Sequence, residues 1–161
     1  MPRVLTIRDY EPRDEAALLV LVRELQVHEG SVYDRMKPPE EIGPWYIVEL
    51  QKQCAESAGR ILVAESEGKV VAYATILATV EDDSIDEVPF TYAYVGDLAV
   101  TKGRRGEGIG KRMLAECERI ARSAGARWLR INALAQNAQA CDTYRSYGFD
   151  EQFIGFEKKL G

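Results

Sequence analysis

Apolar and polar positions alternate or recur along the N-terminal half of the chain in ways that predict one strand and then two helices. Residues 4–10 alternate apolar with polar side chains, which is typical of a strand. Four residues of the next stretch recur at helical spacing: Leu18, Leu21, Val22 and Leu25. A second helix is expected from about residue 44, because Gly43 and Pro44 delay its start.

The rest of the chain is richer in strand patterns. Residues 60–66 and 69–80 predict a hairpin with a tight turn at Gly68. Residues 90–100 predict a long strand in which Gly96 marks a bulge or a close backbone approach. A helix is expected from about residue 108 to Ala124, then a strand over 127–134 and a helix from the N-cap Asn137 to the stop at Gly148. Residues 149–153 and 155–160 predict two closing strands.

This order of elements, β-α-α-β-β-β-α-β-α-β-β, predicts an α/β mixture in which helices cover a sheet. With 161 residues and no linker-like or low-complexity segment, we expect a single domain over residues 1–161.

Composition narrows the classes of function. A net charge of -5 argues against general nucleic-acid binding. No run approaches the ~18 apolar residues of a membrane span, and the N-terminus turns charged too early for a secretory leader. Three widely spaced cysteines suit buried apolar positions in a reducing compartment, so we expect a cytoplasmic protein. With His28 as the one histidine, we expect no metal site.

The stretch RRGEGIGKR, residues 104–112, gathers three glycines and four basic residues at the start of a predicted helix. The first N–H groups of a helix lack partners and carry partial positive charge. Glycine lets a ligand approach that backbone, while Arg105 and Lys111 add whole charges. The stretch therefore favours an anion site, most simply for phosphate. A connection with solvated arginines is the alternative.

Two nucleotide-binding motifs do not fit this stretch. A Walker A loop would need glycine at Arg105 and serine or threonine at Arg112. A dinucleotide fingerprint that starts at Gly106 or Gly108 would need glycine at Lys111 or Met113. Neither of these phosphate ligands is therefore indicated.

Arg105, Gly108 and Gly110 fit the pattern R-x-x-G-x-G, which resembles the acetyl-CoA signature of the GNAT N-acetyltransferase superfamily. A second match follows at the distance usual in that family. It resembles the pattern N-x-x-A-x-x-x-Y-x-x-x-G-F and consists of Asn137, Ala140, Tyr144, Gly148 and Phe149. The order of elements agrees over nearly the whole chain, although the N-terminal third matches only in topology.

The resemblance implies a mixed, mostly antiparallel sheet of about seven strands flanked by about four helices. It implies that the fourth and fifth strands run parallel and open a V that holds acetyl-CoA. The pantetheine arm would bond the backbone of Leu98, Ala99 and Val100, and the pyrophosphate would rest on the turn. The cofactor-binding residues implied in this way are Leu98, Ala99, Val100, Arg105, Gly106, Glu107, Gly108, Ile109, Gly110, Lys111 and Asn137.

The implied reaction is direct attack of a neutral amine on the acetyl thioester. Backbone N–H near Leu98 or Ala99 would stabilise the oxyanion. Tyr144 lies seven residues after Asn137, so the two share a helix face, and it is the candidate acid for the leaving thiolate. The alternative for Tyr144 is a packed core tyrosine.

A proton acceptor for the amine is harder to assign. Members of this family carry a glutamate base at one of two positions, and these two positions are occupied here by Tyr94 and Gly96. Strand alternation points Asp97 to the other face unless a bulge intervenes. The remaining candidates are Glu29, Asp34, Glu81 and Asp82. The acidic loop EDDSIDE, residues 81–87, is either a solvated loop or a funnel for a cationic amine.

We therefore expect an N-acetyltransferase that acts on a primary amine of a small molecule or amino acid and uses no metal. We also expect a homodimer, in which the closing strands could take part. Acetylation of a protein or peptide N-terminus or lysine is the second interpretation. A catalytically weak acyl-CoA-binding sensor is the third.

Overall fold

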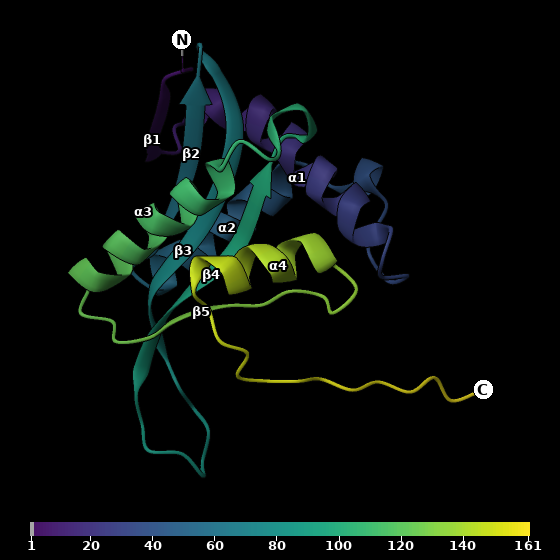
Figure 1. The fold of residues 1–161 in the computed structure, drawn as a ribbon, viewed down its shortest axis with the longest axis vertical. Coiled ribbons are helices and arrows are strands. Elements are labelled where there is room, and N and C mark those ends of the chain that lie inside the picture. Colours follow the sequence, from purple (N-terminus) through teal and green to yellow (C-terminus); the bar gives the residue numbers. More distant parts are fainter. Residues whose placement is uncertain (1) are drawn as a thin grey trace.

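The computed structural model describes residues 2–161 and contains five strands and four α-helices, joined by short 3-10 turns (Figure 1). The strands are β1 (Leu5–Asp9), β2 (Arg60–Ser66), β3 (Lys69–Glu81), β4 (Thr91–Val100) and β5 (Leu129–Ile131). The helices are α1 (Glu15–Gly30), α2 (Pro44–Glu56), α3 (Ile109–Ser123) and α4 (Ala138–Tyr147). The predicted class, a mixed and mostly antiparallel sheet flanked by four helices, is confirmed.

The sheet has the order β1-β2-β3-β4-β5. Each neighbouring pair is antiparallel except β4 and β5, which run parallel. The parallel register is short and runs from Ala93 opposite Leu129 to Val95 opposite Ile131. The parallel pairing of the fourth and fifth strands, which the resemblance implied, is therefore present.

Helices cover both faces of the sheet. Figure 1 shows α3 and α4 in front of the sheet, with α1 and α2 behind it. The front core includes Met113, Leu114 and Cys117 of α3 against the sheet, and the rear core packs α1 and α2 around the buried Tyr73. Both faces are buried, which explains why β2 and β3 read as nearly continuous apolar runs.

The two closing strands expected over residues 149–153 and 155–160 are wrong. Residues 149–161 have no regular secondary structure, and Figure 1 shows this segment leaving the body of the protein. Four large apolar side chains of the segment are exposed: Phe153, Ile154, Phe156 and Leu160. A strand needs a partner, and β5 offers an edge only three residues long, so the segment finds too few backbone groups to pair with.

Gly96 lies in a β-bulge, as the sequence suggested. Ala74 pairs with Leu98 but Ile76 pairs with Val95, so Gly96 and Asp97 together face Thr75. The Asp97 N–H donates to Thr75 Oγ1 at 2.8 Å. A Cβ on residue 96 would lie 2.7 Å from that same oxygen, so this position has room only for glycine. The extra residue shifts the alternation and turns Asp97 toward the α1–α2 face.

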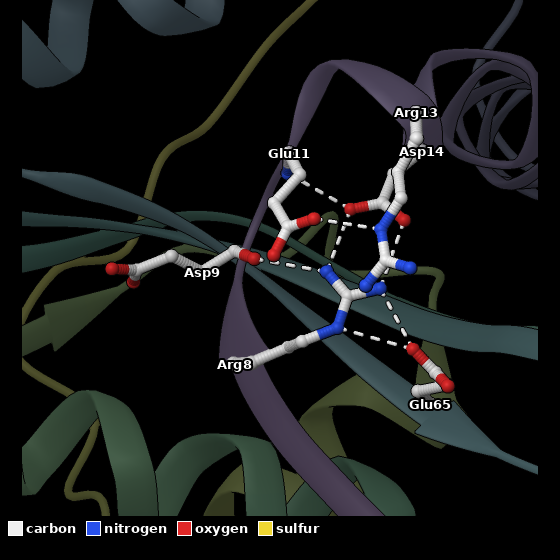
Figure 2. Close-up of polar contacts among 6 residues, drawn as sticks. All are labelled: Arg8, Asp9, Glu11, Arg13, Asp14 and Glu65. Atoms are coloured by element: carbon white, nitrogen blue, oxygen red, sulfur yellow. Dashed lines mark hydrogen bonds and ion pairs between the residues drawn. The ribbon is translucent and has the colours of Figure 1, made fainter.

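An ion-pair network anchors the N-terminal strand to the start of α1 (Figure 2). The Arg8 guanidinium donates to both carboxylate oxygens of Asp14, at 2.8 and 2.9 Å, and to Glu65 of β2 at 2.8 Å. Asp14 is only 5% exposed and also accepts from the Glu11 N–H. Because its carboxylate is fully partnered, chiefly by Arg8, the pKa of Asp14 lies below its usual value.

We expect Asp14→Asn to lower the free energy of unfolding by about 1–3 kcal/mol at neutral pH, because it removes one of the two carboxylates that partner the largely buried Arg8 guanidinium. Because the pKa of Asp14 is lower in the folded state than in the unfolded state, its carboxylate stabilises the fold at pH values above the usual pKa of an aspartate. This stabilisation is lost as the pH falls through the folded-state pKa. Denaturant titrations should therefore show the two proteins converging in acid. Arg13→Ala removes an exposed pair with Glu11 and serves as the control. An equal deficit at neutral and acid pH would contradict this account.

Among residues 2–161, no helix is both long enough and apolar enough to cross a membrane.

Candidate active site

The strands β4 and β5 separate beyond Val95 and Ile131, and a cavity of about 420 Å³ opens between them. One wall is the edge of β4 from Gly96 to Val100, and the opposite wall is the chain from Ile131 to Leu134. The start of α3 closes one end, while α1 and α4 line the sides. The cavity is a cleft in a splayed sheet, so strand backbone as well as side chains is available to a ligand.

The glycine-rich turn lies at one end of this cavity. Gly106 and Gly108 have φ angles of 82° and 78°, a left-handed conformation that favours glycine. Nothing lies within 4 Å of a Cβ built on either residue. Helix α3 starts at Ile109, and no side chain caps it in the part of the chain described. The N–H groups of its first turn therefore have no side-chain partner and face a space open to a ligand.

Basic side chains reinforce the positive charge of this helix start. Arg104, Arg105 and Lys111 all line the cavity. The Arg105 Nε donates to the Val100 carbonyl at 3.1 Å, which ties the turn to the end of β4. Backbone amides, an uncompensated helix start and fixed guanidinium groups together form a site that suits a phosphate or pyrophosphate.

The structure brings together nearly all of the residues that the sequence proposed for cofactor binding. Those that line the cavity are Leu98, Ala99, Val100, Arg105, Gly106, Gly108, Ile109, Gly110, Lys111 and Asn137. Glu107 is the exception. Its side chain is exposed and accepts a hydrogen bond from Arg104 Nε at 2.8 Å, so only its backbone remains available to a ligand.

Helix α4 turns one face toward the cavity, and this face carries Asn137, Ala140 and Tyr144. Asn137 caps the helix, because its Oδ1 accepts from the Ala140 N–H at 3.3 Å. The same oxygen lies 3.2 Å from His28 Nε2 near the end of α1. His28 and Asn137 thus join the two helices that flank the cavity.

Tyr144 both packs against the core and lines the cavity. Its ring meets Phe149 edge-on, with the ring centroids 6.1 Å apart. Burial, with a smaller effect of the Glu29 charge, raises the pKa of Tyr144 to about 12. The phenol therefore stays protonated at neutral pH. Since a thiol titrates near ~8.5, such a phenol suits hydrogen-bond donation to a departing thiolate better than complete proton transfer.

The candidate proton acceptors divide into two groups. Glu29 and Asp97 line the cavity, whereas Asp34, Glu81 and Asp82 do not. The acidic loop follows β3 and lies near the first residue of β4, roughly 17 Å along the strand from Gly96. That separation exceeds the ~8 Å screening length at physiological salt, so the loop fits the solvated interpretation better than the funnel.

Sequence reasoning missed the wall formed by Ile131 to Leu134, together with Leu25 of α1 and Gln139 and Thr143 of α4. One signal was available for the first of these. When two neighbouring strands run parallel, the residues that follow both strands lie at the same edge of the sheet. The residues after Ile131 therefore had to face the end of β4.

A second cavity of about 310 Å³ lies between the ends of α3 and α4 and the start of β5. It is lined by residues such as Glu118, Arg122 and Trp128 and includes none of the residues proposed to bind the cofactor. It also lacks the glycine-rich helix start, so the larger cavity is the candidate active site.

Comparisons with known proteins agree with this geometry. The profile of the acetyltransferase (GNAT) family matches residues 23–149. A variant of the BH1408 protein from Bacillus halodurans superposes with a TM-score of 0.86 at 21% identity, covering 96% of this chain and 99% of that one.

Two aminoglycoside N-acetyltransferases also share the fold. AAC(6')-Iy in complex with CoA has a TM-score of 0.73 at 14% identity, covering 99% of this chain and 98% of that one. AAC(6')-IG from Acinetobacter haemolyticus has a TM-score of 0.71 at 16% identity, covering 97% and 99%. No curated protein matches the sequence.

Proposed function

We propose that this chain, which belongs to the GNAT family of acetyltransferases and is an acyltransferase, moves the acetyl group of acetyl-CoA to a primary amine of a small molecule or amino acid. One observation carries the proposal. The uncapped, glycine-rich start of α3 opens into the same cavity as the free edge of β4 and the hydroxyl-bearing face of α4.

Acetyl-CoA would supply an activated acetyl thioester, and the residues of this chain fit its parts. The start of α3, with Arg105 and Lys111, would hold the pyrophosphate. Leu98 to Val100 would bond the pantetheine arm through the backbone edge that β5 leaves free. A backbone N–H near Leu98 or Ala99 would face the oxyanion, and Tyr144 would donate a hydrogen bond to the leaving sulfur. No metal is required for this chemistry.

A panel of free amines, amino acids and short peptides tests the proposal, with release of free CoA thiol as the readout and mass spectrometry of the product as confirmation. We expect thiol release with a free primary amine and a product that carries one acetyl group. Turnover only with peptides would favour the protein or peptide acetyltransferase. Tight binding of acetyl-CoA without turnover on any amine would favour the acyl-CoA sensor.

We also infer a cytoplasmic homodimer. The exposed apolar side chains of residues 149–161 and the unpaired edge of β5 support it, because each would be covered in a dimer that pairs them. Light scattering should give the mass of two chains for the full protein and of one chain after residues 151–161 are removed. One chain in both samples would exclude the dimer.

A further inference from the structure

Opposite charges line two different parts of the cavity. Arg105 and Lys111 stand at the α3 end, where the proposed pyrophosphate site lies. Glu29 and Asp97 line the wall formed by α1 and the bulge of β4. A cavity that is positive at its α3 end and negative along the wall of α1 and β4 is complementary to an anionic donor and a cationic acceptor.

Glu29 is a carboxylate without a cationic partner. It lies in the last turn of α1 and is half-buried, and its side chain forms no ion pair or hydrogen bond within residues 2–161. The neighbouring His28 is directed to Asn137 instead. Burial, and after it the charge of Asp97, raises the pKa of Glu29. A carboxylate in this state gains from a cation or a proton that enters the cavity.

Asp97 is held in place from the other side. Its Oδ2 accepts hydrogen bonds from the hydroxyls of Tyr46 on α2 and Tyr73 on β3, both at 2.9 Å. Thr75 fixes its N–H. Its Oδ1 has no hydrogen-bond partner in the described structure, and the residue lines the cavity. Asp97 therefore presents one fixed, unshared oxygen next to Leu98, where the thioester is expected.

We propose that Glu29 is the proton acceptor for the attacking amine and that Asp97 positions the ammonium beside it. This inference rests on the proposed function. The acceptor class it names is a strongly basic primary amine, which is an ammonium ion at neutral pH and would be drawn to the two carboxylates.

The protons balance in three steps. An N–H proton of the ammonium passes to a Glu29 carboxylate oxygen, and the freed lone pair forms the C–N bond to the thioester carbon. The tetrahedral adduct then breaks its C–S bond. The proton lost from the new amide nitrogen ends on the sulfur, beside the Tyr144 hydroxyl, and Glu29 returns its proton to water.

Other titratable groups surround Glu29 and bear on its pH dependence. Those that face the same cavity or interact electrostatically with Glu29 are His28 on α1, Tyr46 on α2, Tyr73 on β3, Asp97 on β4, Tyr144 on α4, and Arg105 and Lys111 at α3. Tyr94 on β4 interacts with Asp97 and Tyr144. The tyrosines stay protonated through the neutral range, because burial raises the pKa of each. They therefore stay neutral and do not alter the charge around Glu29 in this range.

The variant Glu29→Gln tests the proposal through its pH profile. A basic amine has a pKa near ~10.4, so at neutral pH we expect kcat/KM to fall about 100-fold without the base. The deficit should shrink as the pH approaches the amine's own pKa. It should also vanish with 2,2,2-trifluoroethylamine, a weakly basic amine that is already neutral. Asp82→Asn, which makes the same charge change in the distant loop, should behave as wild type.

Calorimetry with acetyl-CoA, together with the activity of the wild type, separates the proposed role of Glu29 from the proposed acetyltransferase function. We expect Glu29→Gln to bind acetyl-CoA as wild type does. If wild type acetylates no amine, the proposed function fails. If wild type is active and Glu29→Gln has the same kcat/KM, only the role of Glu29 is overturned. The same holds if kcat/KM falls by one constant factor at every pH and with both amines.

Discussion

Gly108→Asp should weaken acetyl-CoA binding by about 100-fold, because two like charges about 5 Å apart near a protein surface repel by roughly 3 kcal/mol. The new carboxylate would stand at the uncapped start of α3, where the pyrophosphate is expected. It would also fill space that is open around Gly108. Calorimetric titration with acetyl-CoA measures the effect directly.

The fold should survive this change. Aspartate and asparagine are the residues most tolerant of the left-handed conformation after glycine, and both are good helix N-caps. Thermal unfolding of Gly108→Asp should therefore stay close to wild type while binding is lost. Gly108→Asn has nearly the same size and backbone strain without the charge, so we expect a much smaller loss of affinity. Unchanged affinity in the aspartate variant would remove the phosphate site from α3.

Tyr144→Phe should lower kcat by about 100-fold and leave the Kd for acetyl-CoA nearly unchanged. The substitution removes the hydroxyl of a residue that lines the cavity but keeps the ring that packs against Phe149. Steady-state turnover with the best amine of the panel, together with calorimetry, separates the two effects.

Tyr147→Phe provides a matched control on the same helix. Its hydroxyl donates to Glu118 Oε2 at 2.6 Å, and the residue lies outside the candidate active site. We expect this variant to turn over as wild type does. Equal turnover in Tyr144→Phe and wild type would assign Tyr144 to packing alone.

The sequence predicted the parts of this molecule that depend on local chemistry. Periodicity located the helices and most strands. Gly96 was predicted to mark a bulge or a close backbone approach, and the structure shows the bulge. Two spaced motifs then located both the start of α3 and the cavity face of α4, since each motif belongs to one continuous segment.

What the sequence could not supply depends on pairing and on register. Residues 149–160 have a strand pattern, but pairing needs a long enough neighbour, and β5 is too short. The orientation of Asp97 depends on which residues of β3 and β4 oppose each other, and alternation alone pointed it to the wrong face. Glu29 joins the site only because α1 crosses behind the splayed strands, far from either motif.

Amide hydrogen exchange with and without acetyl-CoA tests most directly whether the cavity between β4 and β5 is the donor site. We predict slower exchange in residues 98–100 and 105–111 when acetyl-CoA is saturating, and little change in β1 and β2. Protection confined to residues 121–129 and 147–149, around the second cavity, or no protection at all, would contradict the account.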